Sequence, residues 1–165
     1  MGRFVRFLVL IAAFAVNHIA SAQTIAPGEK VDDFSLPAAN GEWGQRLAEQ
    51  KGLPVMLIWT DRCDRCEERL SAYQLLAESH QIDGLVSWVI WTPDGNDAAP
   101  KMRIPVLKNS GYWNTAWQFE PKPAVMLINR DGVLDYLFTG PLSRRYDEVE
   151  SVLSGWLAGQ SKGSH

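Results

Sequence analysis

The sequence predicts a single α/β domain in which buried strands alternate with helices. The first observation is a set of four runs rich in apolar residues and bounded by turn residues, at 53–59, 85–91, 124–129 and 133–139. The second is a pair of segments with apolar residues at helical spacing, one after the first run and one near the C-terminus. A length of 165 residues and a hydrophobic content of 46% suit one globular domain and exclude wholesale disorder.

The domain is expected to begin with an extended lead-in. Residues 27–41 hold two prolines, two glycines and a short apolar centre at Phe34 and Leu36, which indicates at most a short strand. Residues 44–51 are expected to add one or two helical turns. The continuous apolar run at 53–59 then predicts the first strand of the main sheet.

A helix is expected directly after this strand. Its apolar residues Leu70, Tyr73, Leu76 and Ala77 form one stripe, and charged residues occupy much of the remaining surface. Gly84 ends the helical stretch, and the second strand follows it.

The second half of the chain is predicted to hold the other two strands and a last helix. Residues 93–110 contain three prolines and indicate mostly loop, and residues 111–119 are expected to form a short helix. An Asp-Gly hairpin turn at 130–132 joins the last two strands. Ser143 is expected to cap a helix over about 144–158, after which the tail frays.

Residues 1–22 have the three parts of a secretory signal peptide. Arg3 and Arg6 give a positive start, residues 7–16 form an apolar run, and small residues end at Ala22. The alternative is a membrane anchor, but the uninterrupted apolar run has ten residues, against roughly 20 needed to span a bilayer. Cleavage after Ala22 is therefore expected, with no stable membrane span afterwards.

Cleavage would leave residues 23–165 as the mature domain, with its core at about 27–158. The full chain carries a net charge of −3, and the mature chain would carry 14 basic and 19 acidic residues, or −5. A protein that neutralises nucleic-acid phosphates is normally basic, so no nucleic-acid partner is expected. Export also allows a cysteine pair to stay oxidised.

The chemistry is concentrated at Cys63 and Cys66, the two cysteines of the chain, in the order strand, C-x-x-C, helix. One pair excludes a multi-bridge disulfide framework and a four-cysteine zinc site. At the start of a helix, orphan backbone N–H groups and the helix dipole stabilise a thiolate. Arg62 and Arg65 flank Cys63 and act in the same direction, whereas Asp61 and Asp64 oppose them.

Other uses of the pair remain open from the residues alone. It could be a structural disulfide, the soft ligand set of a copper-binding or copper-delivery protein, or the remnant of an inactive domain. His80 lies fourteen residues after Cys66 and is expected to be a solvated surface residue beyond reach of the cysteines. A further hypothesis is a binding module that uses the numerous tryptophans, although most of these could fill the core.

Three segments carry a family resemblance. Residues 53–66, LPVMLIWTDRCDRC, resemble the strand and active-site turn of thioredoxin-like proteins. The lead-in at 31–36 and Gly41 is similar to that of the exported TlpA/ResA-type branch. The segment PAVMLINRDG at 123–132 is similar to the family's cis-proline, strand and hairpin. The resemblance covers roughly residues 27–158.

The resemblance implies a thioredoxin fold, with a central mixed sheet of about four to five strands flanked by helices. It also implies thiol–disulfide exchange, with Cys63 as attacking thiolate, Cys66 as resolving thiol and Pro123 as a cis-proline beside them. The backbone of Lys122 would then face the cysteines, where an extended substrate chain could pair with it. Trp59 aligns with an aromatic of the family's strand end, as a core residue or as a residue that tunes the site.

The sequence also departs from the family pattern. Arg62 stands where tryptophan is common, and Arg69 and Leu57 stand where carboxylates are common. With Arg65 and Lys122, the site is expected to be electropositive and the pKa of Cys63 low. A stabilised thiolate makes the disulfide more oxidising.

The sequence thus predicts an exported thiol–disulfide oxidoreductase, and the expected compartment is the bacterial periplasm. It requires no bound cofactor and no metal. The expected partners are exported proteins with thiols or disulfides and an electron donor or acceptor protein, and the expected state is a monomer. Whether the enzyme acts as reductant, oxidant or isomerase stays open.

Overall fold

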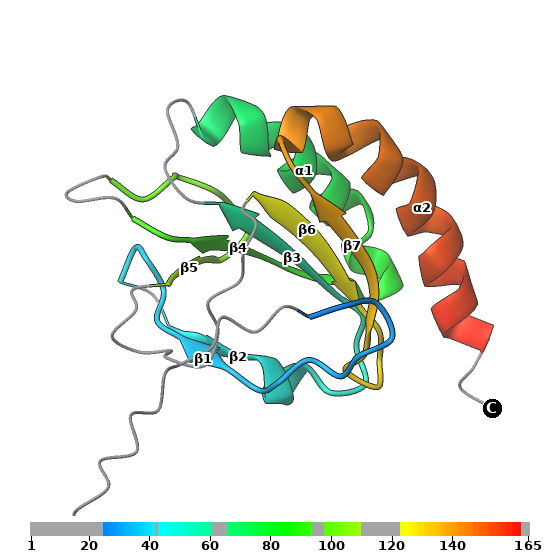
Figure 1. Ribbon diagram of the computed structural model, residues 1–165. Coiled ribbons are helices and arrows are strands. Elements are labelled where there is room, and N and C mark those ends of the chain that lie inside the picture. The colour runs from blue at the N-terminus through cyan, green and yellow to red at the C-terminus, as the bar shows by residue number, and fades with distance from the viewer. Residues whose placement is uncertain (1–24, 42, 61–65, 94–97, 110–122, 163–165) are drawn as a thin grey trace, which may run out of the picture.

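The computed structural model describes residues 25–41, 43–60, 66–93, 98–109 and 123–162. Within these ranges the chain forms seven strands, two α-helices and two short 3₁₀ helices (Figure 1). In chain order they are β1 (Ser35–Leu36), β2 (Gln45–Arg46), η1 (Leu47–Gln50), β3 (Val55–Thr60), α1 (Cys66–Ser79), η2 (Gln81–Asp83), β4 (Val86–Trp91), β5 (Val106–Lys108), β6 (Ala124–Ile128), β7 (Leu134–Thr139) and α2 (Leu142–Lys162).

The main sheet is mixed, as predicted, and has the strand order β5-β4-β3-β6-β7. Strands β3, β4 and β5 are parallel, and β6 and β7 are antiparallel to their neighbours. Every residue of β3 and β6 is buried, which explains their uninterrupted apolar sequences. The β6–β7 turn is the predicted hairpin: the Asn129 side chain accepts N–H bonds from Asp131 and Val133, and Gly132 adopts φ +80°.

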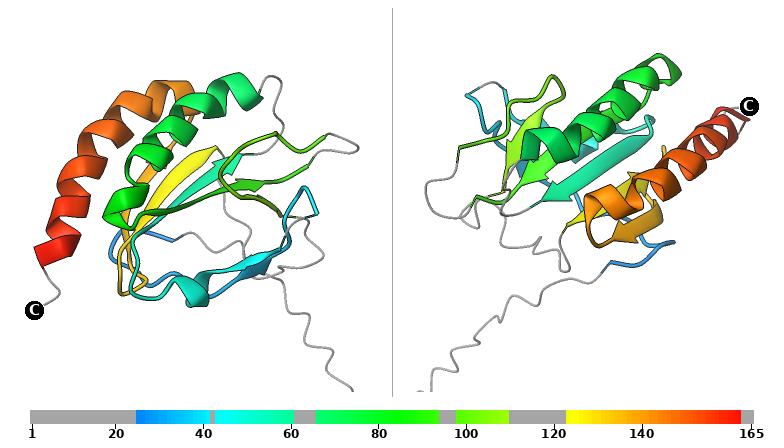
Figure 2. Two further views of the ribbon diagram at one scale, coloured as in Figure 1. Left: turned by 180° about the vertical axis from the view of Figure 1, so that it is seen from behind. Right: turned by 90° about the horizontal axis from the view of Figure 1, so that it is seen from above.

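Both α-helices pack on one face of this sheet, side by side (Figure 2). The predicted stripe of α1 is buried there, since Leu70, Tyr73, Leu76 and Ala77 are each at most 5% exposed. Val149 and Leu153 of α2 join the same apolar cluster. These helices therefore cover one face of the sheet with a shared apolar cluster.

The N-terminal segment, residues 25–50, covers the other face of the sheet (Figure 1). At one sheet edge it pairs with the start of β7, where the Val31 N–H donates to the Gly132 carbonyl at 2.9 Å. At the other edge it pairs with β5, where the Ala39 N–H donates to the Val106 carbonyl at 2.8 Å. The lead-in thus closes a second apolar layer and partly protects both sheet edges.

The four predicted strands agree with β3, β4, β6 and β7 to within two residues, and η1 lies within the expected helical turns. Two short strands were missed. β2 has two residues and β5 has three, and β5 lies inside the segment expected to be mostly loop. Such short strands are defined by pairing with distant segments, which local sequence does not encode.

The prediction for the last helix was wrong at both ends. α2 starts at Leu142, so Ser143 lies inside the helix and is not its cap. Pro141 precedes the helix, where its missing N–H costs nothing, and its carbonyl accepts the Arg144 N–H at 2.9 Å. The helix also continues through Gly159 to Lys162, because the Gln160 side chain bonds to Asp135 at 3.3 Å.

Some predicted features lie outside the described residues. These are the signal peptide at 1–22 and the short helix at 111–119.

Candidate active site

The candidate site lies at the end of the sheet where the parallel strands β3, β4 and β5 have their C-termini. Trp59 of β3 pairs with Ala124 of β6, so Pro123 lies at this end of the sheet beside the end of β3. Pro123 is half-buried, and its carbonyl accepts the N–H of Gly140, just after β7, at 2.9 Å. The ends of β3, β6 and β7 are thus held together around Pro123.

The cysteine pair follows this end of the sheet along the chain. Helix α1 begins at Cys66, in agreement with the predicted order of strand, C-x-x-C and helix. Residues 61–65 join Thr60 to Cys66 and contain Cys63, Arg62 and Arg65. These three residues and Lys122 lie outside the described residues, as does the peptide bond that was expected to be cis before Pro123.

Three polar residues link the strand ends next to this segment. The Thr92 N–H donates to the Thr60 carbonyl at 2.9 Å, which holds the last residue of β3. The Asn109 N–H donates to the Trp91 carbonyl at 2.8 Å, and its side-chain Nδ2 donates to the Thr92 hydroxyl at 3.4 Å. Asn109 is 6% exposed. Sequence reasoning missed Thr92 and Asn109, although a polar residue directly after an apolar run was a visible signal.

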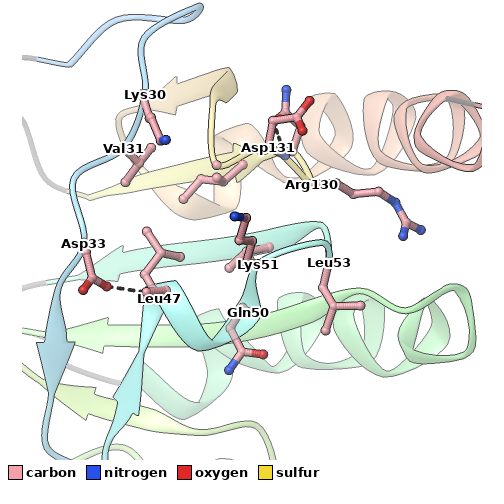
Figure 3. Close-up of a pocket in the computed structure, with 14 residues that line it drawn as sticks. Lys30, Val31, Asp33, Leu47, Gln50, Lys51, Leu53, Arg130 and Asp131 are labelled. Atoms are coloured by element: carbon pink, nitrogen blue, oxygen red, sulfur yellow. Dashed lines mark hydrogen bonds between the residues drawn. The ribbon is translucent and has the colours of Figure 1, made fainter. Parts of the chain in front are cut away.

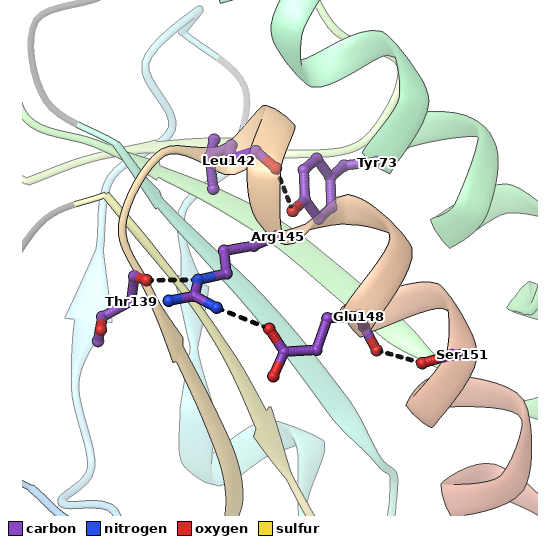
Figure 4. Close-up of polar contacts among 6 residues, drawn as sticks. All are labelled: Tyr73, Thr139, Leu142, Arg145, Glu148 and Ser151. Atoms are coloured by element: carbon purple, nitrogen blue, oxygen red, sulfur yellow. Dashed lines mark hydrogen bonds and ion pairs between the residues drawn. The ribbon is translucent and has the colours of Figure 1, made fainter.

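The first turn of α2 fixes the end of β7 (Figure 4). The Arg145 guanidinium donates to the Thr139 carbonyl and to the Glu148 carboxylate, both at 2.8 Å. The Tyr73 hydroxyl of α1 donates to the Leu142 carbonyl at 2.8 Å. Burial raises the pKa of Tyr73 well above its ordinary value, so this hydroxyl stays a donor. Both helices are therefore tied to the strand end beside Pro123.

The described residues at which the sequence departs from the thioredoxin-like pattern bring no carboxylate to the site. Leu57 is fully buried in the apolar layer under the N-terminal segment and brings no carboxylate to the sheet interior. Trp59 belongs to the same apolar cluster and is 1% exposed, which fits a role in the core. Arg69, in the first turns of α1, is exposed.

His80 directly follows the C-terminus of α1, at the other end of that helix from Cys66. Its side chain is 17% exposed, so it is a partly covered surface residue rather than a fully solvated one. Its Nδ1 lies 2.8 Å from Asp83 and its Nε2 lies 3.4 Å from the Ser154 hydroxyl on α2. This order resembles a Ser-His-Asp triad, but the backbone N–H groups around Ser154 are used within the helix, so none can serve as an oxyanion hole.

The described part of the chain has neither a cluster of metal-ligating side chains nor a helix that could cross a membrane. In that part, no group of three His, Cys, Asp or Glu side chains is close enough to hold a metal ion. Likewise, none of its helices combines the length and hydropathy needed to cross a bilayer.

Comparison with known proteins gives structural relatives only. No protein-family model and no curated protein matches the chain. A candidate thiol:disulfide interchange protein DsbE from Chlorobium tepidum is 18% identical with a TM-score of 0.65, over 81% of this chain and 99% of its own. A candidate protein disulfide isomerase from Bacteroides thetaiotaomicron is 17% identical with a TM-score of 0.67, over 86% and 96%.

A third similar structure is the exposed lipoprotein thioredoxin Etrx1 from Streptococcus pneumoniae. It is 20% identical, with a TM-score of 0.53, over 71% of this chain and 99% of its own. All three match the overall fold of this chain, with TM-scores of 0.53 to 0.67. The chain therefore has the thioredoxin-like fold of thiol:disulfide interchange proteins, as the sequence resemblance predicted.

Proposed function

We propose that the protein is an exported thiol–disulfide oxidoreductase whose redox pair is Cys63 and Cys66. The observation that carries the proposal is the combination of three features at the same end of the sheet. β3 ends at Thr60, α1 begins at Cys66, and Pro123 directly precedes β6 beside the end of β3. Cys63 is three residues along the chain from both Thr60 and Cys66.

The proposed reaction proceeds in two exchanges that balance in electrons and protons. The Cys63 thiolate attacks one sulfur of a substrate disulfide, forms a mixed disulfide and releases a substrate thiolate, which takes up a proton. Cys66 loses its proton and attacks the Cys63 sulfur. This closes the Cys63–Cys66 disulfide and frees the second substrate thiol. The dithiol thereby supplies two electrons, and oxidation of a substrate dithiol is the reverse sequence.

Two features support a reactive Cys63. The backbone N–H groups at the start of α1 lack helical partners and favour negative charge nearby. Arg62 and Arg65 flank Cys63 and oppose Asp61 and Asp64, whereas the family's carboxylate positions hold Leu57 and Arg69. The helix start and the two arginines both act to lower the pKa of the Cys63 thiol.

Pro123 is proposed to be the cis-proline of the site. Its half-buried ring lies at the start of β6, and β6 pairs with β3. A cis bond before Pro123 would turn the backbone of Lys122 toward the pair, where an extended substrate segment could add as a strand.

Export is proposed from the signal-like residues 1–22. One structural relative is an exposed lipoprotein thioredoxin, which is compatible with an extracytoplasmic role. The proposed partners are exported proteins with accessible thiols or disulfides, together with an electron donor or acceptor protein. A monomeric protein of the bacterial periplasm fits these features.

The test is dithiothreitol-driven reduction of insulin disulfides with three forms of the protein. The native protein should accelerate insulin precipitation, and Cys63→Ser should reduce the rate to that of the Cys63→Ser/Cys66→Ser double variant. Cys66→Ser should retain the attacking thiol and accumulate a mixed disulfide with glutathione, visible by mass spectrometry. Unchanged activity in Cys63→Ser would contradict the assignment. Tight Cu(I) binding without any exchange would instead favour copper delivery.

A further inference from the structure

A cavity lies at the end of the sheet opposite Thr60 and Pro123 (Figure 3). It has a volume of about 260 Å³ and lies between the N-terminal segment, η1 and the β6–β7 turn. Val55, the first residue of β3, lines it, whereas Thr60, the last residue, lies at the candidate active site. Six residues of strand separate the two places by about 17 Å.

The floor of this cavity is apolar. Val31, Leu47, Val55 and Ile128 line it, and each is at most 8% exposed. They come from four segments that are distant in the sequence. Such a floor favours a hydrocarbon group over water.

The walls carry positive charge. Lys30, Lys51 and Arg130 line the cavity, and Figure 3 shows Lys30 and Lys51 on different walls, with apolar side chains between them. Among the described residues, neither lysine side chain has an ion pair or a hydrogen bond. Arg130 donates from Nη1 to the Gly52 carbonyl at 3.0 Å, and its buried Nε lacks a protein partner.

The acidic side chains of the cavity do not cancel this charge. Asp33 accepts hydrogen bonds from Arg46 at 2.7 Å and from the Ala48 N–H at 2.9 Å, so its carboxylate is already neutralised. Asp131 is the other carboxylate in the lining. Three cations against one unpaired carboxylate make the cavity locally positive, in a chain of net charge −3.

We propose that this cavity binds a small organic anion with an apolar body, such as a medium-chain carboxylate. The acid group would lie between the ammonium groups of Lys30 and Lys51, and the hydrocarbon would cover the buried floor. A volume of about 260 Å³ is just below the range of about 300–1,000 Å³ that is typical of small-molecule sites, which favours a ligand smaller than a drug-sized molecule. This site is independent of the proposed redox function, because no cysteine takes part in it.

The test is a titration of the purified full chain with octanoate, followed by ¹H–¹⁵N chemical shifts of the Leu47, Val55 and Gly132 amides. Octanoate should give saturable shifts at these amides. Octan-1-ol, which lacks the charge, and inorganic phosphate, which lacks the hydrocarbon, should each bind at least about tenfold more weakly. The absence of saturable shifts, or equal binding of octan-1-ol or phosphate, would overturn the proposal.

Variants separate this cavity from other binding sites. Lys30→Gln/Lys51→Gln should weaken octanoate binding about tenfold or more, because both exposed lysines are expected to contact the acid group. Lys108→Gln, which removes an exposed lysine at the end of β5, should change binding less than twofold. Binding that both variants leave unchanged would refute the cavity as the site. Insulin reduction measured in parallel would report separately on the proposed redox function.

Discussion

Asn109 is a buried polar residue whose place in the site depends on three strands. Its side chain bonds to the Thr92 hydroxyl, and the Thr92 N–H holds the Thr60 carbonyl at the end of β3. Removing a buried hydrogen-bonding group leaves its partner unsatisfied and costs about 1–3 kcal/mol.

We therefore expect Asn109→Ala to lower the free energy of unfolding by about 1–2 kcal/mol. Urea denaturation measures this change. Lys108→Ala alters the exposed neighbour and is the control, with a change within about 0.5 kcal/mol. Equal stability of Asn109→Ala and Lys108→Ala would show that the Asn109–Thr92 contact does not support the strand ends.

The charge of the Cys63 thiol is a second property of single residues. Arg62 and Arg65 should stabilise the thiolate, so the pKa of Cys63 is expected below the free-cysteine value of about 8.5. Thiolate absorbance against pH measures it. Arg65→Gln should raise the pKa, whereas Lys51→Gln, an exposed lysine at the opposite end of the sheet, should leave it unchanged. A pKa of 8.5 or more in the native protein would contradict the electropositive site.

Among single residues, the sequence predicted the positions of those that directly adjoin a strand. The start of α1 at Cys66 follows β3, and Pro123 directly precedes β6, so both could be placed from the neighbouring apolar runs. Asn109 was missed because β5 is defined by pairing with β4 and with residues 37–39. The partial covering of His80 was missed because it depends on α2, where Ser154 is 74 residues away.

Among the elements, the N-terminal segment is fixed partly by one carboxylate. Burial acts to raise the pKa of Asp33, but hydrogen bonds from the Ala48 N–H and from Arg46 outweigh it and hold the pKa below its ordinary value of 3.8. Because the folded pKa is the lower one, the stabilisation is complete above about pH 4.5. It is lost as pH falls through the folded pKa.

Asp33→Asn should therefore weaken the dependence of stability on pH. The free energy of unfolding of the native protein should fall more between pH 5 and pH 3 than that of the variant. Since the Asp33 side chain is 38% exposed, solvent screening keeps the difference below about 1 kcal/mol. Urea denaturation at both pH values checks it. Parallel pH dependence in the two proteins would show that Asp33 titrates equally in the folded and unfolded states.

Helix α2 is joined to β7 through Asp135. This carboxylate accepts hydrogen bonds from Trp156 Nε1 at 2.7 Å, from Gln160 at 3.3 Å and from Asn129 at 2.8 Å. The first two donors belong to α2, and Gln160, the one beyond Gly159, holds the last turn of the helix against β7.

Trp156→Phe keeps an aromatic ring but removes the shortest of these bonds. Because the acceptor is a carboxylate, we expect a loss of about 1.5–3 kcal/mol in the free energy of unfolding. Tyr136→Phe, which removes a hydroxyl from an exposed ring next to Asp135, should change stability by less than about 0.5 kcal/mol. Thermal unfolding compares the two variants, and an equal effect would remove Asp135 as the link between α2 and β7.

The elements could be predicted to the extent that they bury their own apolar pattern. β3 and β6 are buried along their full length, and their boundaries were predicted closely. The ends of α2 were not, because Pro141 and Gln160 act through a cap and a tertiary contact. Short strands such as β2 have too few residues for a periodic pattern.

At the scale of the whole molecule, the two ends of the mixed sheet carry different features. One end holds the start of α1, the start of β6 and the strand termini linked by Thr92 and Asn109. The other end holds the positive cavity under the N-terminal segment. Periodicity alone predicted an α/β domain, and the resemblance supplied the mixed sheet of about four to five strands. The strand order β5-β4-β3-β6-β7 was not predicted, because the pairing of distant strands depends on the complete fold.

The reduction potential of the Cys63–Cys66 couple tests the proposed exchange most directly. The full chain would be equilibrated in glutathione and dithiothreitol buffers, and the oxidised fraction measured by thiol alkylation and mass spectrometry. We predict reversible exchange with a potential between about −270 and −120 mV, the range of thioredoxin-like catalysts. A pair that does not exchange, or that stays oxidised below about −300 mV as structural disulfides do, would contradict the proposed function.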